Sequence, residues 1–180
     1  MDNIFKTSLE AVNNKIVIRI IKEEDSISEL TTVLHSAYKK LKDMGLEYVA
    51  SYQSDETTRK RIEGAYRCYL AEYESKIIGT ICLYAPKWHE NSKWYSNSFV
   101  AKFGQFAVNP NYQNLGIGSK LIAIVEQSAR EMHGVTELSL DTAETANHLI
   151  TYYGKKGFRY IEDVNWSVTN YKSVIMSKKL

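Results

Sequence analysis

The feature that most constrains this chain is the segment from Phe106 to Ser119, in which an apolar run passes through a turn directly into an amphipathic helix. The residues from Phe99 to Val108 are mostly apolar or aromatic, which predicts a strand. Proline, asparagine and glycine follow and end that strand, because they favour turns. From Ile117 onward, apolar residues recur at helical spacing, at Leu121, Ile124, Val125 and Met132.

The beginning of this helix is suited to bind an anion. Its first N–H groups have no partner within the helix and carry the positive end of the helix dipole. Gly116 and Gly118 have no Cβ, so a negative group can approach the backbone closely. The pattern Q-x-x-G-x-G is neither a G-x-x-x-x-G-K-[ST] phosphate loop nor a G-x-G-x-x-G dinucleotide motif. On these residues alone, a pyrophosphate site and an ordinary strand-to-helix turn both stay open.

The rest of the chain predicts alternating strands and helices in one domain. Strands are expected over 15–21, 66–73, 77–84, 136–140, 158–164 and 171–176, and helices over 26–44, 56–63 and 145–156. A hairpin precedes the central helix, which predicts an α/β (α+β) fold. We expect a mixed, mostly antiparallel sheet of six to seven strands with helices on both faces. A length of 180 residues fits one domain, over residues 15–180, preceded by a loose arm over residues 1–14.

Composition and charge argue against several classes of function. Lys+Arg 23 and Asp+Glu 21 give a net charge of +2 without a run of five like charges, so we expect no nucleic-acid or membrane partner. No apolar run approaches the ~20 residues that span a bilayer, and no signal-peptide pattern opens the chain, so a cytoplasmic protein is expected. Cys68 and Cys82 lie in strand-like sequence and are expected to be buried thiols. The four histidines are scattered, so no metal site is expected.

A second segment, N-H-L-I-T-Y-Y-G-K-K-G-F from Asn147 to Phe158, follows the first after one more strand. Together the two segments, in this order and spacing, resemble the GNAT superfamily of N-acetyltransferases. The specific part spans residues 105–160, and the overall strand order extends the resemblance over about residues 15–180. The resemblance implies a single-domain GNAT fold with acetyl-CoA as the cosubstrate and no metal.

The resemblance also implies roles for particular residues. The pyrophosphate loop would comprise Gln113, Asn114, Leu115, Gly116, Ile117, Gly118 and Ser119. Phe106, Ala107 and Val108 would pair with the pantetheine arm at a place where two strands splay apart, and Asn147 would bond the pantetheine or phosphate region. The Val108 N–H would face the thioester oxygen as an oxyanion donor. Tyr153 would protonate the leaving thiolate, since a phenol with a pKa near 10 is protonated at neutral pH.

The sequence departs from the family at the catalytic base. Histone-type members carry a glutamate on the central strand, where this chain has Lys102, with Gln105 nearer the site. Other groups that could accept the proton are Glu144, Asp141, Glu90 and His89, but a surface or capping role is favoured for each of them. No base is therefore assigned.

The acceptor is expected to be an amine of a small molecule or a peptide. Two segments, 43–58 and 86–98, would frame it, and both contain acidic and aromatic residues that suit a cationic amine. The acidic residues are Asp43, Glu47, Asp55, Glu56 and Glu90. A polyamine, an aminoglycoside, an amino acid and a peptide N-terminus stay open, as does a homodimer through the closing strands. We expect direct acetyl transfer; the alternative is a non-catalytic acyl-CoA-binding or sensing module on the same fold.

Overall fold

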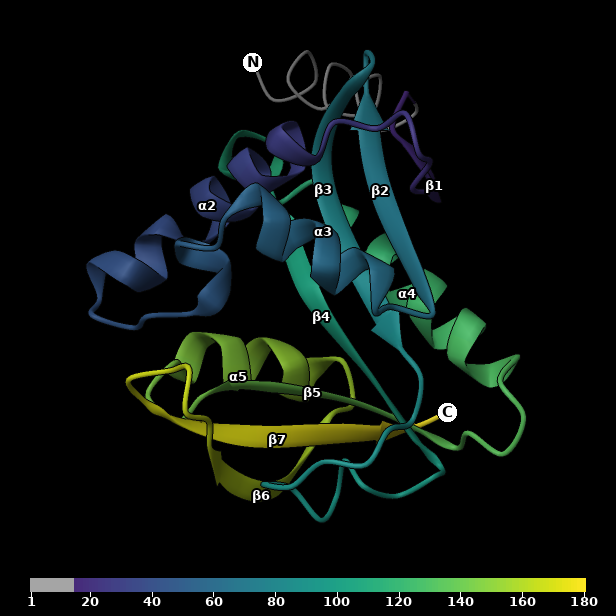
Figure 1. Cartoon of the computed structure of the whole chain (residues 1–180), viewed down its shortest axis with the longest axis vertical. Helices are drawn as coiled ribbons and strands as arrows, with labels where there is room; N and C mark the ends of the chain where they lie inside the picture. Colours follow the sequence, from purple (N-terminus) through teal and green to yellow (C-terminus); the bar gives the residue numbers. More distant parts are fainter. Residues whose placement is uncertain (1–14) are drawn as a thin grey trace, which may run out of the picture.

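The structure is a computed structural model that describes residues 15–180; the expected arm over residues 1–14 lies outside the described residues. Its strands form one sheet of order β1-β2-β3-β4-β5-β7-β6 (Figure 1). The strands are β1 (Val17–Ile20), β2 (Arg67–Tyr73), β3 (Lys76–Tyr84), β4 (Val100–Val108), β5 (Glu137–Ala143), β6 (Arg159–Asn165) and β7 (Lys172–Lys179). The helices are α2 (Ile27–Asp43), α3 (Asp55–Glu63), α4 (Ile117–Arg130) and α5 (Asn147–Lys155), with short 3-10 turns at Val49–Ser51 and Pro110–Tyr112.

The expected mixed sheet is confirmed. Among the described strands only β4 and β5 run parallel, and all other neighbours are antiparallel. The hairpin between β2 and β3 turns at Glu74 and Ser75, whose φ angles of 48° and 61° fit the twist of a tight hairpin. Two strands are longer than expected: β5 continues to Ala143 and β7 to Lys179, because the two strands pair along their whole length.

Helices cover both faces of the sheet. On one face, Tyr69 and Ala71 of β2 pack with α4 and with Tyr153 of α5. On the other face, Leu70 packs against Leu34 of α2, which follows from the alternation of side chains along a strand. Ser26 caps α2 by accepting a hydrogen bond of 3.2 Å from the Glu29 N–H. The central strands are therefore buried between two helical layers.

The sheet forks between β4 and β5. These strands pair only at their first residues, from Val100 opposite Glu137 to Lys102 opposite Ser139, and then diverge, as Figure 1 shows. A bulge opposes Gln105 and Phe106 of β4 to one residue of β3, and Gln105 has a left-handed φ of 49°. A bulge bends its strand and increases the local twist. It therefore helps β4 to turn away from β5.

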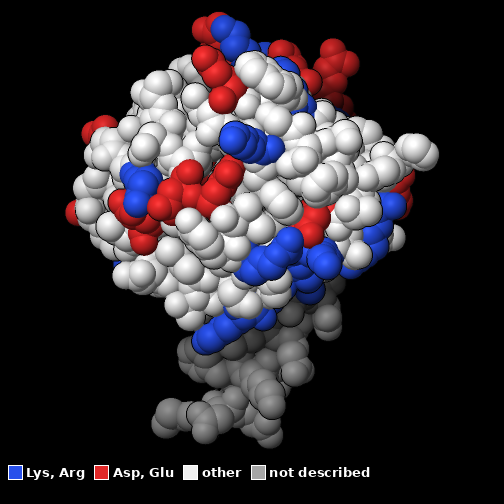
Figure 2. Space-filling view, turned by 90° about the horizontal axis from the view of Figure 1, so that it is seen from below, with Lys and Arg blue, Asp and Glu red and all other residues white. Residues whose placement is uncertain are grey.

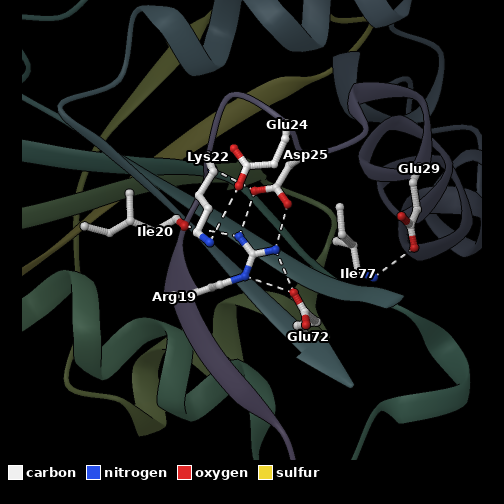
Figure 3. A network of polar contacts seen from close by, with 8 residues as sticks. All are labelled: Arg19, Ile20, Lys22, Glu24, Asp25, Glu29, Glu72 and Ile77. Atoms are coloured by element: carbon white, nitrogen blue, oxygen red, sulfur yellow. Dashed lines mark hydrogen bonds and ion pairs between the residues drawn. The ribbon is translucent and has the colours of Figure 1, made fainter. Parts of the chain in front are cut away.

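A polar network fastens the far edge of the sheet to α2 (Figure 3). Arg19 of β1 donates to Glu72 of β2 at 2.6 Å and to Asp25, just before α2, at 2.7 Å. Asp25 also accepts from the Lys22 N–H at 2.7 Å. The Arg19 guanidinium holds the pKa of the Asp25 carboxyl below its usual range. This network lies far from the fork and supports only the framework.

Charged side chains of both signs lie side by side on the end of the molecule where β6 lies (Figure 2). Elsewhere in the ion-pair pattern, Lys172 of β7 pairs with Glu144 at 2.8 Å and with Asp163 at 3.0 Å. Inside the sheet, Cys68 and Cys82 are buried free thiols opposite one another on β2 and β3, as expected. None of the helices within residues 15–180 is both long and apolar enough to cross a membrane.

Candidate active site

The fork contains a cavity of about 360 Å³, here called the first cavity, between α2, β4, α4 and α5. The residues of the strand–turn–helix segment make up much of its wall. Ten residues singled out in the sequence line it: Phe106, Ala107, Val108, Gln113, Asn114, Gly116, Ile117, Gly118, Ser119 and Tyr153. One local stretch of chain and one distant tyrosine thus meet around the same space.

The beginning of α4 presents free backbone donors to this cavity. Gly116 is the N-cap, has a left-handed φ of 77° and offers no capping side chain. The first helical hydrogen bond is donated by the Lys120 N–H to the Gly116 oxygen at 3.1 Å, so the N–H groups of Ile117, Gly118 and Ser119 have no intrahelical partner. Such N–H groups bind phosphate oxygens well.

A lysine side chain and tight packing around a glycine complete this end of the cavity. Lys156, just after α5, donates to the Ser119 hydroxyl at 2.7 Å and so brings a positive charge to the helix start. A Cβ on Gly118 would lie 3.2 Å from the Phe106 ring and 3.3 Å from the Tyr152 hydroxyl. Glycine therefore keeps the helix start close to β4 and α5. These residues fit a pyrophosphate group.

The Val108 N–H points into the fork. The next amide, that of Asn109, donates to the Ile78 oxygen on β3 at 2.8 Å. Since successive amides along a strand point to opposite sides, the Val108 N–H points away from β3, to the side that β5 has left. The Phe106 carbonyl points to that side too and accepts from the Tyr38 hydroxyl at 3.1 Å. The fork thus exposes a backbone donor in a largely apolar space.

Tyr153 lies on α5 with its ring packed against Phe103, Tyr152 and Phe158 at centroid distances of 6.2, 5.3 and 6.1 Å. Its hydroxyl makes no hydrogen bond with any residue between 15 and 180. Burial raises the pKa of Tyr153 well above its usual value, so the phenol is protonated at neutral pH. The group is held in place by its ring and is free to donate a proton.

Two expected cofactor contacts lie outside the first cavity. Leu115 is partly buried and packs against the main core. Asn147 is the exposed first residue of α5. Their roles stay predictions.

A second cavity, of about 410 Å³, lies along an earlier part of β4, from Lys102 to Gln105. The segment from Trp166 to Tyr171, which sequence reasoning did not include, forms one of its walls. From the expected acceptor segments, only Tyr48, Val49, Ala50 and His89 line it. The acidic residues expected to attract a cationic amine line neither cavity. The structure therefore does not support a cationic acceptor held by these acidic residues.

The two cavities share three lining residues, Tyr38, Tyr48 and Asp141. Asp141 is the one carboxylate among the residues that line either cavity. Its oxygens accept from the Tyr95 hydroxyl at 3.1 Å and from the Trp166 indole N–H at 3.0 Å. Of the other candidate bases, His89 lines only the second cavity, and Glu144 and Glu90 line neither.

Positive groups face Asp141 across the second cavity. The ammonium of Lys102 donates to the His89 Nε2 at 2.8 Å and lies 4.8 Å from the centre of the Tyr95 ring. Burial lowers the pKa of both Lys102 and His89, so that His89 is neutral at neutral pH. Arg61 reaches the same cavity from α3. Sequence reasoning noted Lys102 only as a departure and missed Arg61, because no local pattern marks either residue.

Comparison with known proteins identifies the family that has this geometry. Residues 31–158 match the model of the Acetyltransferase (GNAT) family. The chain belongs to this family. It is 32% identical over 142 residues to the S-(2-succino)cysteine N-acetyltransferase of Bacillus subtilis, covering 78% of this chain and 82% of that one. It is 26% identical over 147 residues to the S-alkylcysteine N-acetyltransferase of the same organism, with 79% and 78% covered.

A solved structure agrees on the fold. A GNAT family acetyltransferase from Elizabethkingia anophelis, with acetyl-CoA bound, matches with a TM-score of 0.63 at 20% identity and covers 93% of this chain and 99% of that one. The expected GNAT fold and an acetyltransferase that uses acetyl-CoA as donor are thereby confirmed. Within residues 15–180, no group of three or more His, Cys, Asp or Glu residues is placed to hold a metal ion.

Proposed function

We propose that this GNAT enzyme transfers the acetyl group directly from acetyl-CoA to the amino group of an S-substituted cysteine. The observation that carries the proposal is the meeting of the two cavities at Asp141, with Tyr153 lining the first cavity only. The acceptor class rests on the names of the two Bacillus subtilis relatives.

Acetyl-CoA would bind in the first cavity. The free N–H groups at the start of α4 and the ammonium of Lys156 would hold its pyrophosphate, and the open edge of β4 would pair with its pantetheine arm. When bound, it supplies the acetyl group as a reactive thioester. The Val108 N–H would then lie where it stabilises negative charge that develops on the thioester oxygen.

Asp141 would bind the amino group of the acceptor where the cavities meet. The acceptor arrives as an ammonium ion and must lose a proton before its nitrogen can attack the thioester carbon. The Asp141 carboxylate would orient the ammonium and pass that proton to solvent, since its residue is exposed. Tyr95 and Trp166 hold the carboxylate in place through their hydrogen bonds.

Tyr153 would act on the leaving group. As the new C–N bond forms and the C–S bond breaks, the phenol donates its proton to the thiolate and is later reprotonated from solvent. Overall, the ammonium and the thioester give an amide, a thiol and one released proton. The buried Cys68 and Cys82 line neither cavity, so this account has no acetylated enzyme.

The test is release of coenzyme A thiol from acetyl-CoA with a panel of amines: S-methyl-L-cysteine, other amino acids, spermidine, an aminoglycoside and a short peptide. We expect turnover to be greatest with S-methyl-L-cysteine. A clear preference for another class of amine, or turnover with none of them, would overturn the proposal.

Asp141→Asn separates the role of this carboxylate from a structural one. Because asparagine keeps the shape but not the charge, we expect kcat/KM for the amine to fall by about 100-fold, while the Kd for acetyl-CoA stays within about 3-fold. Glu144→Gln is the matched control, since Glu144 lines neither cavity and pairs with Lys172. Equal effects of the two variants would remove Asp141 from the mechanism.

A further inference from the structure

The second cavity contains two cations that form no direct ion pair with a carboxylate of the described chain, although the Asp141 carboxylate lines the same cavity. Lys102 and Arg61 both line it, and neither forms an ion pair with an acidic residue within residues 15–180. Lys102 is partly buried, and the hydrogen-bond partner of its ammonium is the uncharged imidazole of His89. Burying a cation without a counter-ion is costly, so such a residue indicates a negative ligand.

A series of hydrogen bonds through two buried glutamine side chains holds Arg61 in position. It donates to the Gln53 Oε1 at 3.1 Å, and the Gln53 Nε2 donates to the Gln105 Oε1 at 3.0 Å. Because a guanidinium only donates, it fixes which way the Gln53 amide faces, and Gln53 in turn fixes Gln105. The last group in this series is therefore a donor, the Gln105 Nε2. This atom is buried and has no acceptor among the described residues.

A second polar atom in the same neighbourhood also has no partner. The Tyr84 hydroxyl is buried without a hydrogen bond inside the described part of the chain. The Tyr84 ring lies 6.0 Å from the Lys102 ammonium, and it lies against Gly104 together with Arg61. Unsatisfied buried polar atoms are rare in folded proteins. Tyr84 lines neither cavity, but Gln105 lines the second cavity with Lys102 and Arg61, so its free donor and the two cations point to an anionic group there.

One of the positive groups, Lys102, lies close to the negative one, and Arg61 lines the same cavity. Lys102 lies 4.8 Å from the centre of the Tyr95 ring, and the hydroxyl of that same tyrosine donates to Asp141 at 3.1 Å. A negative charge at the meeting of the cavities and positive charges just beyond it match the two charges of an α-amino acid, which are attached to one carbon atom. A polyamine or an aminoglycoside has no group for Lys102 and Arg61.

We propose that Arg61 and Lys102 bind the α-carboxylate of the acceptor and thereby select a free amino acid over other amines. This inference rests on the proposed function and adds the residues that decide its specificity. Trp166, Val168 and Tyr171, which line the same cavity, would pack around the substituent on sulfur. Arg61 and Lys102 thus bind and position the acceptor, while the reacting groups stay with Asp141 and Tyr153.

The experiment compares S-methyl-L-cysteine with its carboxamide, which keeps the amine and the thioether but lacks the carboxylate charge. We expect the native enzyme to prefer the acid by about 100-fold in kcat/KM, since the amide leaves two cations unpaired. Arg61→Met should reduce this preference to about 10-fold, and Arg61→Met combined with Lys102→Met should bring it close to 1.

The matched control is Arg59→Met, which removes the same charge from the same helix. Arg59 is exposed and lines neither cavity, so the acid-to-amide preference should stay at its native value. Each preference is a ratio measured on one protein, so a loss of folded enzyme cancels. Thermal melting and the Kd for acetyl-CoA confirm that the variants are folded.

The possible failures are distinct. If the native enzyme acetylates the amide as well as the acid, or if Arg61→Met and Arg59→Met give the same preference, the carboxylate site is wrong and the proposed function stands. If the native enzyme acetylates neither compound, the proposed function fails and this inference fails with it.

Discussion

The two cavities that meet at Asp141 are built in different ways. The first is built largely from backbone: the N–H groups at the start of α4, the glycines that let a ligand approach, and the open edge of β4. The second is built from side chains that project from α2, α3, β4, β5 and the loops 86–98 and 166–171. A backbone site suits a donor shared by a whole family, and a side-chain site can be changed residue by residue to suit one acceptor.

The largest expected effect concerns Tyr153, the proposed proton donor in the first cavity. Tyr153→Phe removes only a hydroxyl that makes no hydrogen bond within residues 15–180, so the fold should be kept. We expect kcat to fall by about 100-fold because the thiolate must leave unprotonated, while the Kd for acetyl-CoA changes by less than about 3-fold. Steady-state kinetics and calorimetry measure the two quantities, and an unchanged kcat would exclude Tyr153 as the acid.

The next effect sharpens the claim that the first cavity depends on backbone. Gly118→Ala adds a Cβ that would lie 3.2 Å from Phe106 and 3.3 Å from the Tyr152 hydroxyl, so the start of α4 must shift. We expect the KM for acetyl-CoA to rise by about 10-fold with little change in the KM for the amine. Gly154→Ala is the control, since a Cβ there meets nothing within 4 Å. Comparable KM values in the two variants would contradict the backbone account.

A smaller effect is expected where the cavities meet. The Tyr48 hydroxyl bonds to Thr142 at 2.8 Å and accepts from the Ala143 N–H at 2.8 Å, an amide that the fork leaves without a strand partner on that side. Tyr48→Phe should lower the free energy of unfolding by about 1–2 kcal/mol and raise the KM for the amine by about 3-fold. Urea unfolding and steady-state kinetics measure both. Tyr52→Phe, which loses one exposed hydrogen bond, should do neither.

The smallest effect on catalysis is expected at the network in Figure 3, remote from both cavities. Arg19→Met should leave kcat/KM unchanged and lower the free energy of unfolding by about 1–2 kcal/mol at pH 7. Because the pKa of Asp25 is lowered in the folded state, its contribution is present above its unfolded pKa of about 3.9 and is lost as the pH falls through the folded value.

Urea unfolding across pH checks the Arg19 prediction. The difference between native and variant protein should shrink as the pH falls below about 4, because protonated Asp25 no longer needs the guanidinium. Lys22→Met serves as the control, since the exposed pair of Lys22 and Glu24 at 3.6 Å is worth little. A loss of stability that is the same at every pH would assign the effect of Arg19→Met to packing.

The same contrast explains what the sequence could predict. The first cavity depends on residues close together along the chain, from Phe106 to Ser119, so its strand, turn and glycines form a readable pattern. The order of strands and helices was readable for the same reason, from local periodicity. The second cavity brings together Tyr38, Arg61, Lys102, Asp141 and Trp166 from distant segments, and no spacing in the sequence relates them.

Two further structural features could not be predicted from the sequence. The bulge at Gln105 depends on how β4 pairs with β3, and nothing in the residues themselves marks it. The position of β7 between β5 and β6 is set by pairing along the whole of β5. The acidic residues of segment 43–58 misled the expectation about the acceptor, because composition alone does not tell which side chains face a cavity.

The central claim is that donor and acceptor occupy the two cavities together and react where they meet. Initial rates measured while both acetyl-CoA and S-methyl-L-cysteine are varied test it directly. Direct transfer in a ternary complex predicts double-reciprocal lines that intersect. Parallel lines, together with an acetylated enzyme trapped after reaction with acetyl-CoA alone, would contradict the account.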